Sequence, residues 1–284
     1  MVDLRNRKYG VDISDGMMRI VGRSYSAGRV LIDRIVEIGI DRPEKEILGP
    51  ESELYLAISE RDSIIKMVTI PTDRSLDSDK VAQFELMAAL LDGPEKYYLE
   101  TYATNGAAER LAVAYNRGQV DRRLHFVEEK LIKPRGFKLR SLAMAAGYLN
   151  YCRPEGGKFL CLVDISGRSA SYCFLRDNCA VDVGIVGNDS DITNGNGGDT
   201  KALVLDLLAT IRFKLAGINR ASQSLPLSRI LITGASAGTD LAANIETALH
   251  VSTSLPQPRK ELFSPEAILS AEKNLVGLGL TISD

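Results

Sequence analysis

The chain has 284 residues, of which 45% are hydrophobic and 25% charged, and its formal net charge is −2. This length is sufficient for two lobes with separate cores, and the composition is that of an ordinary globular protein. The charge shows none of the basic excess that nucleic-acid binding leaves in a sequence. No run of about 20 apolar residues predicts a membrane-spanning helix, and the first residues lack the apolar segment of a signal peptide.

The four cysteines indicate core packing rather than metal or redox chemistry. Cys152, Cys161, Cys173 and Cys179 include no Cys-x-x-Cys pair, and neither histidine lies near them. Zinc sites depend on such spacings. We therefore expect free, reduced cysteines, as in an intracellular protein.

The apolar pattern predicts strands that alternate with helices along the chain. Runs rich in Ile and Val predict strands at 8–13, 17–23, 29–38, 54–59 and 64–70, and an apolar stripe predicts a helix at 77–92. Further strands are expected at 97–103, 110–115, 159–165, 169–176 and 229–233. Further helices are expected at 119–133, 142–151, 201–216, 240–249 and 265–275. This order predicts an α/β fold.

Two stretches between these elements read as irregular structure. Residues 41–50 form a connector rich in Pro and Glu, and residues 187–199 are rich in Gly, Asn and Asp and predict a loop. Asp199 or Thr200 is expected to cap the 201–216 helix, and Gly217 is expected to end it.

A strand–turn–strand pattern occurs twice. The sequence Asp-Ile-Ser-Asp-Gly at 12–16 follows one apolar strand, and Asp-Ile-Ser-Gly-Arg at 164–168 follows another. A tight turn after a strand presents several backbone N–H groups, which can bind phosphate oxygens. A carboxylate at the strand end can hold Mg²⁺ through water. One such hairpin alone is an ordinary turn, but two facing each other would clamp the phosphates of a nucleotide.

A third segment strengthens the pattern. The strand at 229–233 runs into Gly-Ala-Ser-Ala-Gly at 234–238 and then into a helix. Small residues at a helix N-terminus allow a nucleoside or phosphate to approach the backbone closely. By itself this is a simple turn, and its place after the two hairpins is what makes it informative.

These three segments, in this order, resemble the phosphate-1, phosphate-2 and adenosine motifs of the actin/Hsp70-like ATPase superfamily, at 12–19, 164–171 and 234–240. The best likeness is to its PilM branch, which is related to FtsA. Residues 54–71 resemble the strand pair that opens the inserted subdomain 1C, and Val-Gly-Leu-Gly-Leu at 276–280 resembles the closing helix.

The resemblance implies a two-lobed actin-like, ribonuclease H-like α/β fold with a small inserted 1C-type subdomain. It implies a first lobe at 1–40 and 119–155, an insert at 41–118 and a second lobe at 156–284. Only 70 residues separate Asp164 from Gly234, so we expect the 2B subdomain to be reduced or missing.

The same resemblance implies a site for ATP and Mg²⁺. Asp12 and Asp164 would hold the metal through water. The nucleotide-binding residues that it implies are Asp12, Ser14, Asp15, Gly16, Arg19, Asp164, Ser166, Gly167, Arg168, Ser169, Gly234, Ala235 and Gly238.

The departures from the family pattern are as informative as the matches. The family has Gly after Asp-Ile in both loops, where this chain has Ser14 and Ser166, whose Cβ atoms obstruct the approach of a phosphate. Its acidic residues before phosphate-2 correspond to Ala143 and Ala145, which cannot orient an attacking water. We therefore expect weak or lost nucleotide hydrolysis and no efficient enzyme, with ATP and Mg²⁺ bound weakly or not at all and no catalytic residue.

In the PilM family, a groove beside subdomain 1C receives the short cytoplasmic N-terminal peptide of PilN, a single-span inner-membrane protein. By resemblance, a PilN-like peptide would contact Ile64, Ile65, Met67 and Phe84. An extended peptide could pair with a strand edge or lie in an apolar channel there. Self-association is a further expectation, and no contact with nucleic acid is expected.

The function expected from this resemblance is that of a bacterial cytoplasmic scaffold for a type IV pilus or type II secretion-like platform, held at the inner membrane through its partner. One alternative is an active actin-like ATPase that drives pilus assembly. Another is an FtsA-like division protein, although that branch ends in an amphipathic membrane helix and this sequence ends in Thr-Ile-Ser-Asp at 281–284.

Overall fold

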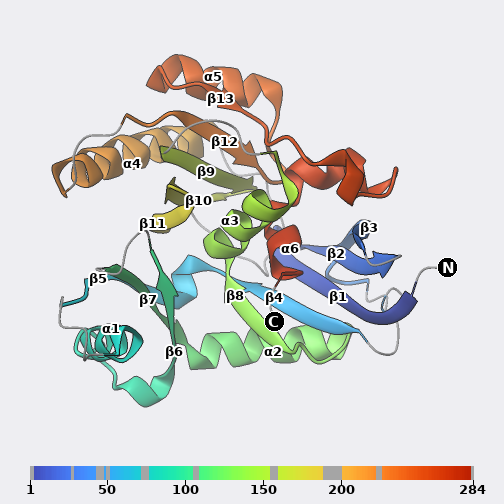
Figure 1. Ribbon diagram of the computed structural model, residues 1–284, viewed down its shortest axis with the longest axis horizontal. Helices are drawn as coiled ribbons and strands as arrows, with labels where there is room; N and C mark the ends of the chain where they lie inside the picture. Colours follow the sequence, from blue (N-terminus) through green and yellow to red (C-terminus); the bar gives the residue numbers. More distant parts are fainter. Residues whose placement is uncertain are drawn as a thin grey trace.

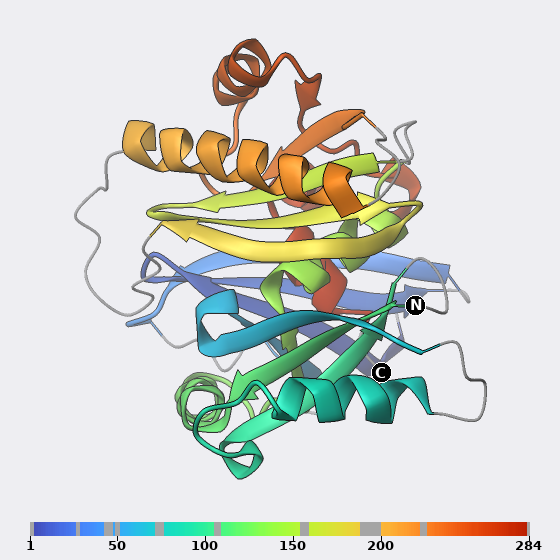
Figure 2. The same ribbon diagram turned by 90° about the vertical axis from the view of Figure 1, so that its left-hand side faces the viewer.

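The computed structural model describes residues 3–26, 29–42, 48, 52–71, 77–104, 109–153, 159–187, 200–221 and 226–282. Within these residues the chain forms two five-stranded sheets and one three-stranded sheet. Figure 1 shows the second five-stranded sheet and its helices at the top, the first at the right and the three-stranded sheet at the lower left. Figure 2 shows the same parts as a stack, with α1 at the opposite end from α5.

The first sheet has the strand order β3-β2-β1-β4-β8. Its strands are β1 (Asp3–Ser14), β2 (Met17–Ser26), β3 (Arg29–Gly39), β4 (Glu53–Ile58) and β8 (Gly136–Leu139). The first three are antiparallel neighbours, whereas β4 runs parallel to both β1 and β8.

The second sheet repeats this topology in the order β11-β10-β9-β12-β13. Its strands are β9 (Phe159–Ser166), β10 (Ser169–Arg176), β11 (Cys179–Gly187), β12 (Arg229–Thr233) and β13 (Thr253–Ser254). Again three antiparallel strands are followed by two parallel ones. The duplicated hairpin in the sequence therefore belongs to a duplicated sheet.

Two helices cover the outer face of the second sheet. They are α4 (Thr200–Ala221) and α5 (Thr239–Leu249). Apolar residues of both helices, among them Leu207, Ile211 and Ile245, form one cluster with the strands. The α4 helix continues through Gly217, where we expected it to end, because a single glycine lowers helix stability by only about 1 kcal/mol. Residues 188–199, with the expected loop and Asp199, lie outside the described residues.

Two helices lie between the sheets, namely α3 (Arg140–Tyr151) and α6 (Leu275–Leu280) (Figure 1). They approach backbone to backbone, since a Cβ at Gly147 would stand 2.1 Å from the Leu275 carbonyl oxygen and one at Gly279 would stand 1.7 Å from that of Ala143. A Cβ at Gly10 of β1 would likewise stand 2.1 Å from the Gly277 oxygen. Residues 275–280 therefore pack on the first sheet, although we had placed them in the second lobe.

The last expected helix, at 265–275, differs from the structure. A 3₁₀ helix, η5 (Ala267–Lys273), occupies most of that range, and α6 begins where the expected helix ended. Gly277 and Gly279, in the segment at 276–280 that resembles the closing helix, lie inside α6, where the close packing requires residues without a Cβ.

The three-stranded sheet has the order β5-β7-β6, with β5 (Ser63–Thr69), β6 (Tyr97–Ala103) and β7 (Glu109–Asn116). The helix α1 (Ser78–Met87) packs Ala82 and Leu86 on one face of this sheet. The helix α2 (Arg117–Lys130) packs Val120 and Val127 into the main core.

The strand expected at 54–59 forms as β4, but it lies in the first sheet and not in the inserted unit where we placed it. It is buried along almost its whole length and pairs with a parallel strand on each side, as is typical of a central parallel strand. The insert therefore begins after β4. The strands expected from the sequence did not include β11. The helix α1 ends at Met87, five residues before the expected end at residue 92.

The four cysteines are free, as expected, and three of them are buried. In the part of the chain that the structure describes, no helix combines the length and apolar character needed to cross a membrane.

Candidate functional site

The two repeated hairpins meet at their turns. Asp15 and Gly16, between β1 and β2, have φ values of +52° and +71°, and Gly167, between β9 and β10, has a φ of +55°. A Cβ at Gly167 would stand 1.9 Å from Oδ1 of Asp15. The turns thus face each other as the sequence predicted, and the Asp15 carboxylate lies against the second turn.

The third segment joins the hairpins at Gly234, which has a φ of +97°. A Cβ there would stand 2.2 Å from Oδ1 of Asp164 and 2.4 Å from the Ile165 carbonyl oxygen. Glycine is therefore required both by the backbone angle and by the space. Ala235 is exposed in the turn, and Gly238 stands immediately before α5.

A buried charge cluster lies directly behind the turns. Its five charged residues are Asp12, Arg19, Glu60, Arg140 and Asp164, and each is only 3% to 5% exposed. Buried charges are stable in a protein only when they are paired and hydrogen-bonded. The partners of each group therefore decide what the cluster can bind.

Arg140, the first residue of α3, contacts both repeated aspartates. Its Nε and Nη2 atoms donate to Oδ1 of Asp12 at 3.0 and 2.6 Å, and Nη2 also donates to the Ile13 carbonyl oxygen at 3.2 Å. Its Nε atom lies 3.9 Å from Oδ2 of Asp164. One guanidinium thus connects the first sheet to the second through the two carboxylates that we expected to hold a metal.

Arg19 supplies the second positive charge. It donates a hydrogen bond to Oγ of Ser14, and its Nη1 atom lies 3.7 Å from Oδ2 of Asp12. Its Nη2 atom pairs with Glu37 at 3.1 Å. The Ser14 hydroxyl, at the position of a family glycine, therefore helps to hold an arginine. The equivalent hydroxyl of Ser166 is buried and has no hydrogen-bond partner among the described residues.

Glu60 completes the cluster from the short 3₁₀ helix η2 (Glu60–Asp62), which follows β4. Its carboxylate accepts hydrogen bonds from the Ser141 backbone N–H at 2.6 Å and from the Ser171 hydroxyl at 2.8 Å. Ser171 belongs to β10, so this contact also joins the two five-stranded sheets. Accepting a free N–H at the start of α3 is a capping role for Glu60.

Burial shifts the ionisation of two carboxyl groups in the cluster. It raises the pKa of Asp164 to about 7, an effect that the Arg140 guanidinium opposes and the Asp12 carboxylate reinforces. Burial also raises the pKa of Glu60, while hydrogen bonds from Ser141 and Ser171 act in the opposite direction. Both shifts follow from the cost of a buried negative charge.

The structure brings together most of the predicted site residues. Asp12, Ser14, Arg19 and Asp164 belong to the charge cluster, and Asp15, Gly167 and Gly234 lie at the facing turns. The remaining members lie around the turns. Gly16 faces open space, Arg168 is exposed, and Ser169 is buried opposite Ser166.

Two important residues, Glu60 and Arg140, are absent from the predicted set. A signal for Arg140 was present, because a cation at the first residue of a helix opposes the helix dipole and calls for an acidic partner. Ala143 and Ala145, where we expected the family's acidic residues, are buried in α3, and the Ala143 carbonyl contacts α6. Ala143 therefore lies in the contact between α3 and α6.

The cluster as arranged does not fit a magnesium ion. A metal or its water shell would need the Asp12 oxygens, but Oδ1 of Asp12 accepts two N–H groups of Arg140. Two guanidinium groups already supply the positive charge that a Mg²⁺ ion would bring. No group of three or more His, Cys, Asp or Glu side chains within the described ranges has a metal-binding arrangement.

The four residues predicted for a partner groove divide between the two faces of β5. Ile64 is 37% exposed and Phe84 of α1 is 67% exposed. Ile65 and Met67 are half-buried and pack against the main core. This division follows from the alternation of side chains along a strand.

Several solved structures match nearly the whole chain, among them the following three. A PilM–PilN type IV pilus biogenesis complex matches with 15% identity and a TM-score of 0.69, covering 97% of each chain. The cytoplasmic domain of EpsL, an inner-membrane component of the type II secretion system of Vibrio cholerae, matches with 13% identity and a TM-score of 0.55, covering 98% of this chain and 96% of that one. A protein of unknown function with an actin-like ATPase fold, from Bacteroides thetaiotaomicron, matches with 7% identity and a TM-score of 0.57 over both full chains.

No family model and no curated protein matches the sequence. At these identities the likeness establishes the fold. The chain has the actin-like fold, and the structural resemblance to PilM that the sequence indicated is confirmed. The reduced 2B subdomain stays a prediction.

Proposed function

We propose that this protein is a cytoplasmic scaffold of a type IV pilus or type II secretion-like inner-membrane platform, with a nucleotide site that no longer supports efficient hydrolysis. The full-length likeness to a PilM–PilN complex and to the cytoplasmic domain of EpsL supports the assembly role. One neighbour belongs to a type IV pilus biogenesis complex and the other to a type II secretion system, and the proposal therefore covers both kinds of machine.

One observation supports the loss of nucleotide chemistry above all others. The Arg140 guanidinium lies between Asp12 and Asp164, with both of its hydrogen bonds to Asp12 buried. An active site of this fold would use these carboxylates to hold a metal ion. In this chain the Arg140 guanidinium lies against both of them.

Titration with Mg-ATP tests this part of the proposal. Calorimetry should detect no binding in the micromolar range, and a phosphate-release assay should detect no turnover above the buffer rate. The variant Arg140→Ala is the matched comparison, since it removes the competing cation and leaves both carboxylates. Micromolar binding with turnover by the unmodified chain would favour the alternative, an active actin-like ATPase.

For the partner, we propose the short cytoplasmic N-terminal peptide of a single-span inner-membrane protein, a PilN-like arrangement. The supporting feature is β5, an edge strand of the three-stranded sheet. A peptide in extended conformation can add to such an edge. Among the apolar side chains of β5, Ile64 is exposed and Met67 is half-buried against the main core.

A binding assay can separate this surface from other exposed apolar surfaces. The probe is the synthetic cytoplasmic tail of a single-span membrane protein encoded beside this gene, measured by fluorescence anisotropy. Ile64→Asp and Met67→Asp should each weaken binding about tenfold or more, a loss of at least about 1.4 kcal/mol. Leu205→Asp, on the exposed face of α4, is the control and should bind normally. Equal binding by all variants would contradict the proposed groove.

A further inference from the structure

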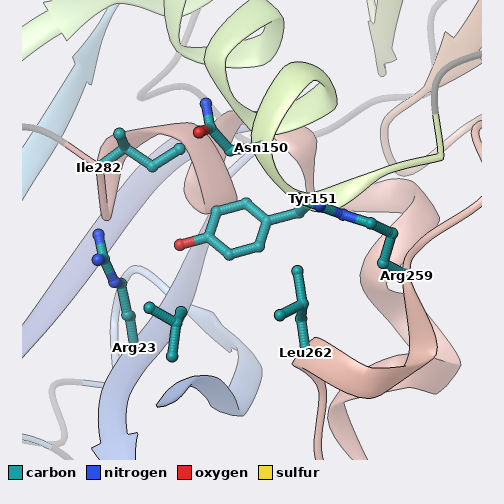
Figure 3. A pocket seen from close by; sticks show the side chains of 7 residues that line it. Arg23, Asn150, Tyr151, Arg259, Leu262 and Ile282 are labelled. Atoms are coloured by element: carbon teal, nitrogen blue, oxygen red, sulfur yellow. The ribbon is translucent and has the colours of Figure 1, made fainter. Parts of the chain in front are cut away.

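A small cavity lies at the opposite end of α3 from the charge cluster. Its volume is about 210 Å³. The residues that line it are Arg23, Val30, Asn150, Tyr151, Arg259, Leu262 and Ile282. They come from β2, β3, the last turn of α3, the segment after β13 and the stretch after α6. Figure 3 shows the Tyr151 ring across the middle, with Arg23 and Arg259 on opposite sides of it.

The walls of this cavity are fixed by backbone pairing. The Arg259 N–H donates to the Tyr151 carbonyl oxygen and the Arg153 N–H donates to that of Gln257, both at 2.8 Å. On the other side, the Ser264 N–H donates to the Ile32 carbonyl oxygen, also at 2.8 Å. The cavity is therefore formed by connected elements of both halves of the molecule.

Two arginines face this cavity, and none of the seven lining residues is acidic. Arg23 donates from Nη1 to the Thr281 carbonyl oxygen at 2.8 Å and from Nη2 to the Tyr25 hydroxyl, but its Nε atom is buried without a hydrogen-bond partner. The Nε atom of Arg259 is also buried and unpartnered within the described part of the chain. A buried donor without an acceptor costs free energy.

Among the residues that line the cavity, none neutralises these charges. Burial raises the pKa of Tyr151, so its hydroxyl is uncharged at neutral pH, and it shares a 2.9 Å hydrogen bond with the Thr281 hydroxyl. The carboxyl end of α3 favours a nearby cation through the helix dipole. A dipole alone, however, provides no acceptor for the Arg259 guanidinium.

We propose that this cavity binds one carboxylate group carried on a short apolar body. A guanidinium presents a planar set of donors that matches a carboxylate. Arg259 lines the cavity, and its side chain makes no hydrogen bond or ion pair to the described residues. The apolar walls formed by Val30, Leu262 and Ile282 select an organic acid over a bare inorganic anion. The carboxylate belongs either to a free small acid or to an acidic residue of a peptide, and both sources share this chemistry.

The test uses the full chain and four probes: valerate, the neutral valeramide, the dipeptide acetyl-Leu-Glu-amide and inorganic phosphate. Binding is followed by the ¹⁵N–¹H signals of the arginine Nε groups. We expect valerate or the peptide to shift the Arg23 and Arg259 signals and to bind at least about tenfold more tightly than valeramide. Arg259→Gln should weaken binding about tenfold, whereas Arg122→Gln, on the exposed face of α2, should leave it unchanged.

The outcomes separate the sources and can overturn the proposal. Binding of the peptide that depends on Arg259 would assign the site to an acidic residue of a partner, and binding of valerate alone would assign it to a free acid. Equal binding of valerate and valeramide, binding of inorganic phosphate only, or unshifted arginine signals in the unmodified chain would each overturn the proposal. The arginine signals are measured on the unmodified chain, so this outcome can be observed even if the Arg259 variant fails to fold.

Discussion

The arginines at the two ends of α3 differ in whether acidic side chains lie next to them. At its N-terminal end, Arg140 is buried and donates to Asp12, while Glu60 accepts the neighbouring backbone N–H. At its C-terminal end, Arg23 and Arg259 face a cavity without an acidic lining residue. A buried arginine whose donors are matched stabilises the fold, whereas an arginine with unmatched donors has capacity left for a ligand.

The largest effect should come from Arg140→Ala. This change leaves Asp12 and Asp164 buried together without their shared cation, and breaking a buried pair in this way costs about 3–5 kcal/mol. Urea denaturation should show this loss in the free energy of unfolding. Arg122→Ala, which removes an exposed arginine of α2, is the control. A loss within about 0.5 kcal/mol, the usual range for surface changes, would mean that Arg140 is not a structural ion.

The next largest effect on the free energy of unfolding should come from Glu60, where two variants separate the role of the charge from that of the hydrogen bonds. Glu60→Ala leaves the Ser141 N–H and the Ser171 hydroxyl without their acceptor and should cost about 1–3 kcal/mol. Glu60→Gln keeps an acceptor oxygen and removes a buried charge, so it should cost less. The same denaturation experiment compares the two. If Gln is as damaging as Ala, the negative charge itself is required.

The stability of the protein should depend on pH through the charge cluster at the N-terminal end of α3. Burial raises the pKa of Asp164 from 3.8 to about 7, so between these values the folded state binds more protons than the unfolded state. Stability should therefore fall as the pH rises from about 4 to 7 through this group. The shift of Glu60 acts in the same direction. Denaturation at pH 5 and 7.5 should show this fall in the unmodified chain and a smaller one in Asp164→Asn.

The smallest effect on stability should come from Arg259→Gln. Its side chain loses no hydrogen bond or ion pair to the described residues, so the free energy of unfolding should stay within about 0.5 kcal/mol of the unmodified chain. Thermal unfolding provides the measurement. A loss as large as that of Arg140→Ala would remove the contrast between the two ends of α3 and assign Arg259 a structural role.

The sequence predicted the turns around the site more fully than the buried charged pairs behind them. The repeated Asp-Ile-Ser segments and the small residues at 234–238 are local patterns, and each lies where its hairpin or turn was expected. The pairs Arg140–Asp12 and Glu60–Ser141 join residues 128 and 81 positions apart. No local pattern encodes such a contact, and Arg140 lay outside the helix expected at 142–151, although it is the first residue of α3.

The misplaced strand β4 illustrates the same limit. Its Ile- and Leu-containing run correctly predicted a strand. Its partners in β1 and β8, however, lie 45 and 81 residues away in the sequence, in the pairs Tyr9–Leu54 and Leu56–Phe137. The hydrophobic pattern of a segment indicates whether it forms a helix or a strand. The sheet to which a strand belongs depends instead on which distant strand pairs with it. The helix α4 shows a milder case, since apolar packing along its length outweighs Gly217.

The glycine contacts of α6 have a consequence for how the chain folds during synthesis. Gly277 meets Gly10 of β1, and Gly279 meets α3, so the inner face of the first sheet stays uncovered until residues 275–280 have left the ribosome. Contacts this far apart in sequence slow folding and prolong the exposure of apolar surface. The second sheet, whose covering helices α4 and α5 are close to it in sequence, can be complete earlier. We expect the nascent chain to depend on chaperones mainly through its N-terminal sheet.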